Sequence, residues 1–234
     1  MIDTNDSEFL SRIEDKSLLS KVMPGAAAAA MINAGDIIGI SGFTPCGYPK
    51  ITMHELAERM KQTPLQVVIW TGASTGSQID TELVAVNGVR VRMPYQTNAN
   101  LRIAHNNGQV SYYDQHLSHV AQQVRAGFFT NVKGERVTGP DFAVVDACKI
   151  GPNGEIYPTT AIGNSPVYVD TAKKVIVEVN TTQPLGLVGM ADIYMRKNPP
   201  HCEPIPILHA GDRIGTPYIK CDPAKIVAIV PCDM

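Results

Sequence analysis

The sequence predicts an α/β fold in which helices flank a mostly parallel sheet. Short apolar runs rich in β-branched residues alternate with glycine-bearing turns and amphipathic stretches, a rhythm that is typical of βαβ units. With 234 residues, 44% hydrophobic and 18% charged, the chain can bury a sizeable core. On length alone, one large domain is favoured over two.

Charge and cysteine usage exclude several classes of protein. The net charge of −2 provides no overall basic field for nucleic acid or an anionic membrane. We find no apolar run long enough to cross a bilayer, and the acidic first twenty residues do not resemble a secretory signal. Five cysteines without a Cys-x-x-Cys pair suggest neither a disulfide framework nor a zinc ribbon. We therefore expect reduced thiols in a cytoplasmic protein.

The first predicted elements are an alanine-rich helix and a buried strand. Pro24 suits the first position of the helix and Gly35 its end. Residues 37–40 form an apolar run typical of a buried parallel strand, and residues 41–50 form the loop at its carboxyl end.

The middle of the chain continues this alternation. Thr52 and Glu55 have the spacing of a capping box, which predicts the start of the next helix. The predicted elements that follow are a strand at 67–70, a helix around 79–86, a strand at 89–93, and helical segments near 99–106 and 115–125.

The last third contains strands separated by turns and one long irregular segment. Strands are predicted at 142–148, 174–179 and 226–230, and a tight hairpin turn at 151–154. Residues 183–217 carry six prolines without a clear period, which predicts a loop-rich excursion within the domain.

Ligands of parallel α/β sheets bind beyond the carboxyl ends of the strands, so the loops there are the first candidate sites. In the loop 41–50, Gly42 and Gly47 let the backbone approach a ligand, while Phe43 or Tyr48 could cover an apolar group. The alternative is a glycine-rich turn that binds nothing.

Two further loops are rich in hydroxyl and amide groups. Residues 71–77 gather four hydroxyl side chains around two glycines, which suits a carboxylate or phosphate, although the Walker ending is absent. A helix N-cap by Ser74 or Ser77 is the simpler alternative. In residues 96–100, Asn98 could likewise be only a helix cap.

Three other candidates have structural explanations that we favour. His116 and His119 lie three residues apart near Asp114, but no third metal ligand is indicated, and we predict no metal site. Cys46 has no neighbouring base that would make it a nucleophile. Asp146 lies in an apolar strand and is expected to be a hydrogen-bonded structural carboxylate.

The candidate loops carry motifs that resemble the acetyl-CoA hydrolase/transferase family, whose members include succinyl-CoA:acetate CoA-transferases. Each motif is weak alone, but together they occur in the family's order between Lys21 and Val230. The motifs are residues 36–43, 47–50, 71–76, 87–89, 95–99, 113–117, 162–165 and 225–230.

The resemblance implies a CoA-transferase-like domain and an enzyme of two similar α/β halves with the active site between them. Residues 1–234 match the N-terminal half, and the nucleophilic glutamate, which becomes a glutamyl-CoA thioester, is expected in the C-terminal half. We therefore assign no catalytic residue here and expect the isolated chain to be inactive. Coenzyme A and a small carboxylate are the implied ligands, with coenzyme A a substrate rather than a covalent cofactor. The implied protein partners are the C-terminal half of the same enzyme and, for the full-length enzyme, further copies of that enzyme in a homo-oligomer.

By motif position, Ser74 and Thr97 match residues that contact the substrate carboxylate. Family members specialised for succinate and acetate have an arginine where this chain has Pro231, so acetate is expected and succinate is left open. The residues expected to line the acyl site are Gly42, Phe43, Thr44, Gly47, Tyr48, Thr75 and Asn98.

Hydrolase and transferase activities both fit this resemblance. Two other functions also stay open. One is a non-catalytic module that binds acyl-CoA or a carboxylate, and the other is a sugar-phosphate isomerase-like enzyme on a related scaffold, which would need a basic phosphate site and an acid/base pair.

Overall fold

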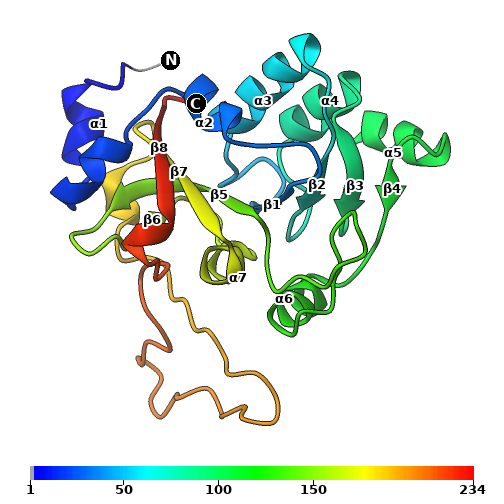
Figure 1. Ribbon diagram of the computed structural model, residues 1–234. Coiled ribbons are helices and arrows are strands. Elements are labelled where there is room, and N and C mark those ends of the chain that lie inside the picture. The colour runs from blue at the N-terminus through cyan, green and yellow to red at the C-terminus, as the bar shows by residue number, and fades with distance from the viewer. Residues whose placement is uncertain (1–2) are drawn as a thin grey trace.

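The computed structural model, which describes residues 3–234, contains an eight-stranded sheet between two layers of helices (Figure 1). The strand order is β4-β3-β2-β1-β5-β7-β8, all parallel, and β6 pairs antiparallel with β5. This confirms the predicted mostly parallel α/β fold. The strands are β1 Ile37–Ile40, β2 Val67–Trp70, β3 Val89–Met93, β4 Ser111–Tyr112, β5 Phe142–Ile150, β6 Ile156–Pro158, β7 Lys174–Asn180 and β8 Ile226–Cys232.

The helices cover both faces of the sheet, which explains why β1 and β2 are apolar at every position rather than alternating. Helices α2 to α5 pack on one face through residues such as Leu56 and Leu83, while Phe9, Val120 and Tyr168 of α1, α6 and α7 pack on the other. The helices are α1 Ser7–Ser11, α2 Gly25–Ala30, α3 Ile51–Gln62, α4 Ser77–Ala85, α5 Ala99–Asn106, α6 Leu117–Arg125 and α7 Ser165–Thr171. None of the helices within residues 3–234 is long and apolar enough to cross a membrane.

The predicted capping box at the start of α3 is wrong. The helix begins at Ile51, so Thr52 lies inside it. The carboxylate of Glu178 on β7 provides the cap instead, because its oxygens accept hydrogen bonds from the amides of Lys50, Ile51 and Thr52 at 2.6, 3.0 and 2.7 Å. A carboxylate placed there also offsets the positive end of the helix dipole. The cap comes from a residue more than a hundred positions away, which local spacing cannot reveal.

The connection between β7 and β8 takes the place of a crossover helix. Within residues 183–217 the structure has one short 3₁₀ turn, Leu185–Leu187, and the segment extends as a long loop away from the sheet (Figure 1). Its base is closed where Ile193 and Thr216 pair and where the Arg213 guanidinium donates to the carbonyls of Gly189 and Ala191.

Candidate functional site

The loops after β1, β2 and β3 meet at one edge of the sheet. Because these strands are adjacent and parallel, their carboxyl ends lie side by side. The amide of Thr44 donates to the carbonyl of Ser74 at 2.7 Å, which joins the first loop to the second. The hydroxyl oxygens of Ser74 and Thr97 are 2.8 Å apart, which joins the second loop to the third.

Ser74 and Thr97 thus form a hydroxyl pair that spans two strand ends. Ser74 is buried, whereas Thr97 is exposed, so the pair lies where buried structure meets the surface. Only one hydroxyl donates within the pair, so the other keeps its proton for a ligand. The arrangement can offer a polar donor to a carboxylate, but the binding role of these two residues stays a prediction.

The glycine-bearing loop 41–50 is held firmly against its neighbours. The ring of Tyr48 packs against Gly76, where a Cβ atom would lie 2.0 Å from the ring. Lys50 donates to the carbonyl of Tyr48 at 2.9 Å, and its ammonium lies 4.6 Å from the centroid of the Tyr48 ring. Tyr48 therefore packs between the first two loops, whereas Phe43, which is 66% exposed, lies at the surface.

A cavity of about 390 Å³ opens beside the hydroxyl pair, where α4 and α5 begin. It includes the predicted residues Thr44, Thr75, Thr97 and Asn98, together with residues that the sequence reasoning did not select. Pro45, Ser77, Ala99 and Asn100 belong to loops already noted, whereas Thr81 lies one turn into α4, on the same helix face as Ser77 four residues before it. The lining residues are Thr44, Pro45, Thr75, Ser77, Thr81, Thr97, Asn98, Ala99 and Asn100.

Asn98 caps α5, as its sequence position suggested. Its side-chain oxygen accepts from the amide of Leu101 at 3.0 Å. Its side-chain nitrogen donates to the carbonyl of Ser77 and the hydroxyl of Thr81, so the same residue also fixes α5 to α4. The alternative that Ser74 or Ser77 caps α4 is wrong, because the N-cap residue is Gly76 and no described side chain caps this helix.

A buried ion pair lies beneath the hydroxyl loop. Arg92 of β3 is fully buried and donates to both carboxylate oxygens of Asp80 on α4, at 2.9 and 3.2 Å. It also donates to the hydroxyl of Thr71 at 2.7 Å, and the hydroxyl of Tyr168 donates to the Thr71 carbonyl at the same distance. Burial raises the pKa of Tyr168, which keeps this phenol neutral and able to donate. This network fixes the end of β2, from which the hydroxyl loop starts.

Asp146 is a hydrogen-bonded structural carboxylate, as its place in an apolar strand suggested. It accepts from the hydroxyl of Thr159 at 2.6 Å and lies 3.7 Å from the Lys50 ammonium. The pKa of Asp146 is raised to about 6. Burial raises this pKa by more than the nearby positive charge of Lys50 lowers it.

Asp146, Glu178 and Cys232 have potential metal-binding atoms within 4.8 Å of one another. However, both oxygens of Glu178 already accept backbone amides, and the Asp146 carboxylate bonds to Thr159 and Asn180. Burial also raises the pKa of the Cys232 thiol to about 12, which disfavours the thiolate that a metal needs. We therefore assign this cluster a structural role.

Replacing Asp146 with Asn is expected to flatten the pH dependence of stability. The pKa of this carboxyl is higher in the folded protein than its ordinary value of 3.8, so the folded state binds more protons between the two values. Stability from this group is therefore lost as pH rises, and wild type should lose about 1 kcal/mol more than Asp146→Asn between about pH 5 and about pH 7. Urea unfolding at both pH values measures this difference. Parallel pH profiles for the two proteins would contradict the assignment.

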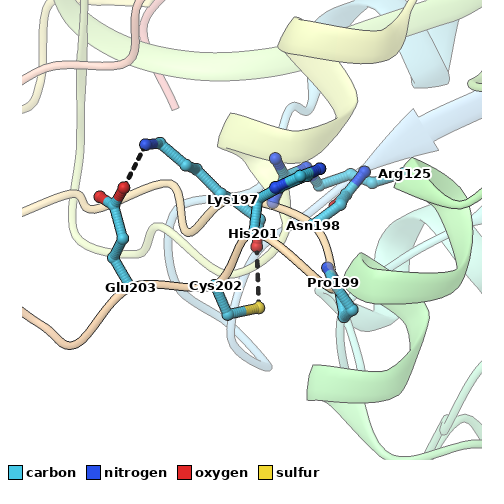
Figure 2. Close-up of a pocket in the computed structure, with 7 residues that line it drawn as sticks. All are labelled: Arg125, Lys197, Asn198, Pro199, His201, Cys202 and Glu203. Carbon is cyan, nitrogen blue, oxygen red and sulfur yellow. Dashed lines mark hydrogen bonds and ion pairs between the residues drawn. The ribbon is translucent and has the colours of Figure 1, made fainter.

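Another cavity, of about 600 Å³, lies between the end of α6 and the excursion (Figure 2). It contains none of the residues predicted to bind substrate. Its cationic groups are already engaged, because Lys197 pairs with Glu203 and Arg125 donates to the carbonyl of Arg196. We therefore place the candidate site at the carboxyl edge of the sheet, where the predicted residues converge.

Comparison with known proteins identifies the family of this chain. The model of the acetyl-CoA hydrolase/transferase N-terminal domain matches residues 8–231, nearly the whole chain. The chain belongs to the acetyl-CoA hydrolase/transferase family. It is 45% identical over 221 residues to the succinyl-CoA:acetate CoA-transferase of Clostridium kluyveri, covering 94% of this chain and 40% of that protein. It is 35% identical to an acetyl-CoA hydrolase of Schizosaccharomyces pombe, covering 95% of this chain and 43% of the relative.

Solved structures support the fold assignment. Glutaconate coenzyme A-transferase from Acidaminococcus fermentans superposes with a TM-score of 0.55 at 18% identity, over 68% of this chain and 66% of that one. RipA from Yersinia pestis gives a TM-score of 0.57 at 15% identity, over 92% of this chain and 43% of that one. The chain thus has a CoA-transferase-like fold and spans about 40% of the length of the curated family members described above.

Proposed function

We propose that this chain forms the carboxylate-binding side of an enzyme that transfers coenzyme A between small carboxylates or hydrolyses an acyl-CoA. The observation that carries the proposal is the Ser74–Thr97 hydroxyl pair, which joins two family motifs at the carboxyl edge of the sheet. The names of the relatives, a CoA-transferase and an acetyl-CoA hydrolase, support both versions of the reaction.

In this proposal the chain binds and orients rather than attacks. Hydroxyl donors hold a carboxylate oxygen at the strand ends, and the packing of Tyr48 on Gly76 fixes the loop that carries Ser74. The nucleophilic glutamate and most contacts to coenzyme A belong to the C-terminal region that the relatives have beyond the part matched here. Residues 1–234 are, on this account, one half of a two-half active site.

A small monocarboxylate such as acetate fits the site better than a dicarboxylate. Among the described residues that line the cavity, none is charged, so no side chain there offers an ion pair to a second carboxylate. Pro231, which stands at the position of the expected arginine, is part of β8 and pairs with Val179 of β7.

The test combines the chain with a separately expressed C-terminal region of the Clostridium kluyveri relative and follows coenzyme A exchange between acetyl-CoA and labelled acetate. Ser74→Ala should lower kcat/KM for acetate by roughly tenfold, which corresponds to the loss of about one hydrogen bond to a charged group. Thr97→Val should have a similar effect, and the double variant should lose less than the product of the two because the hydroxyls act as a pair.

The matched control is Thr63→Val at the end of α3, since Thr63 is exposed and precedes the amino end of β2, whereas Ser74 follows the carboxyl end of that strand. It should leave kcat/KM unchanged. Wild-type exchange rates in both Ser74→Ala and Thr97→Val would refute the proposed carboxylate contact.

A further inference from the structure

A further cavity, of about 410 Å³, lies against β2, β3 and β4 and shares no lining residue with the cavity beside the hydroxyl pair. It lies on the face of the sheet that α6 and α7 cover, because Val68, Trp70, Val91 and Met93 line it and pack in the apolar cluster of that face. Cavities of this size with a mostly apolar lining are typical of small-molecule sites.

Aromatic side chains form one wall of this cavity. The ring of Phe129 lies 5.2 Å from the ring of Trp70 and 6.3 Å from the perpendicular ring of Tyr113, measured between centroids. The segment that carries Phe129 is fixed without a ligand, because Thr130 pairs with Arg136 and the Arg136 guanidinium donates to two carbonyls at the end of α6. The wall is therefore preformed, and its tilted rings suit edge-to-face contact with another flat ring.

The indole N–H of Trp70 is a donor without a partner. Trp70 is only 2% exposed, yet its N–H donates to no residue in the range 3–234. Its nitrogen is not completely enclosed by protein, so the N–H stays open to the cavity that Trp70 lines. Since a buried indole N–H normally has an acceptor, this one marks a position for a ligand oxygen.

Arg90 brings the single charge found among the described residues that line the cavity. The register of β3 against β2 shifts here, because Val67 pairs with Val89 and Val68 pairs with Val91, which leaves Arg90 without a partner of its own. A bulge of this kind re-aims a side chain out of strict alternation, in agreement with the place of Arg90 beside Val91 at the cavity. Arg90 is exposed, and its guanidinium makes no hydrogen bond or ion pair with any other described residue.

We propose that this cavity binds an aromatic carboxylate whose ring lies against Trp70 and Phe129 and whose carboxylate binds Arg90. The two unpartnered groups are both donors and no acidic residue lines the described cavity, so the ligand has to bring acceptor oxygens and negative charge. One arginine matches the single charge of a carboxylate better than the charge of a phosphate dianion.

The spacing of the two donors suggests where the ligand carries its oxygens. Arg90 lies opposite Val68, two residues before Trp70, and two residues of a strand span roughly 7 Å. One ring with a carboxylate at one end and an acceptor oxygen at the other can span this distance. We therefore choose 4-hydroxybenzoate as the probe.

The experiment titrates the ¹⁵N-labelled chain with 4-hydroxybenzoate and follows the NMR spectrum. Trp70 is the single tryptophan, so its indole N–H gives one resonance of its own. This resonance should shift and saturate together with the backbone amides of Ser111, Tyr113 and Thr130, which also line the cavity. Benzoate lacks the second oxygen and should bind several-fold more weakly, and the uncharged 4-hydroxybenzamide should bind more weakly by about tenfold.

Variants of Arg90 test the contact with the carboxylate. Arg90 is exposed, so Arg90→Gln should fold normally and weaken 4-hydroxybenzoate binding by about tenfold. Arg90→Lys keeps the charge without the two-pronged geometry and should have an intermediate effect. The matched control is Arg102→Gln, which removes an exposed arginine from α5 on the other face of the sheet and should bind the probe as wild type does.

Four results would overturn this inference. They are an unshifted Trp70 indole resonance, wild-type affinity in Arg90→Gln, equal binding of 4-hydroxybenzamide, and loss of probe binding when the C-terminal region of the Clostridium kluyveri relative is added. The last result would make this face a contact surface between the two halves instead of a ligand site. None of these measurements needs coenzyme A exchange, so their outcome is independent of the proposed function.

Discussion

Glu178→Leu is expected to lower the free energy of unfolding by about 3–5 kcal/mol, because it leaves three backbone amides at the start of α3 without their acceptor. Glu178 is fully buried, so water cannot replace the lost hydrogen bonds without opening the structure. Urea unfolding measures the change, with the fluorescence of Trp70, the single tryptophan, as the probe.

Two other variants show whether loss of the α3 cap causes the destabilisation expected for Glu178→Leu. Glu178→Gln keeps the shape and one acceptor oxygen but directs an amide group at a backbone donor, so it should have an intermediate effect. Glu58→Gln, also on α3, removes a surface carboxylate that pairs with the exposed Lys61 and should leave the unfolding midpoint unchanged. A change below about 1 kcal/mol for Glu178→Leu would contradict the assigned cap.

Arg92→Met should also destabilise the protein strongly, by about 3–5 kcal/mol, because it leaves the Asp80 carboxylate buried without a counterion. The double variant Arg92→Met/Asp80→Leu should recover much of this loss, since both charges are then removed. Urea unfolding of the two single variants and the double variant gives the coupling energy. If the double variant is no more stable than Arg92→Met, the charge of Asp80 is not the cause of the loss.

Arg92→Met should also affect the candidate site. An unpaired Asp80 would place a negative charge in the first turn of α4, close to the cavity where we propose that a carboxylate binds. Acetate affinity should therefore fall in Arg92→Met even under conditions where the variant is fully folded.

The sheet and the convergence of the candidate loops could be predicted from the sequence because both depend on local patterns. Continuous apolar runs identified β1 and β2, alternating valines identified β3, and the hydroxyl-rich loops after β2 and β3 indicated where Ser74 and Thr97 meet. The ends of parallel neighbours must share one edge, so the convergence follows once the strands are assigned. The short strands β4 and β6 were missed because two or three residues carry too little pattern.

The interactions that hold the site in place were not predictable because they join distant residues. Glu178 and Thr52 are far apart in the chain, and a local capping box at Thr52 was the simpler prediction. Arg92 lies in a strand whose pattern, Val-Arg-Val-Arg-Met, suggests exposed arginines, yet Arg92 is fully buried because Asp80 and Thr71 satisfy it. At both Thr52 and Arg92, tertiary contacts rather than the local sequence pattern determine the structure.

The most direct test of the central claim is coenzyme A exchange between acetyl-CoA and labelled acetate, measured for three samples. The samples are this chain alone, the C-terminal region of the Clostridium kluyveri relative alone, and their mixture. The account predicts exchange in the mixture and none in either part, because one part holds the carboxylate and the other supplies the glutamate. Full exchange by the 234-residue chain alone would contradict it, since the nucleophile would then have to lie within residues 1–234.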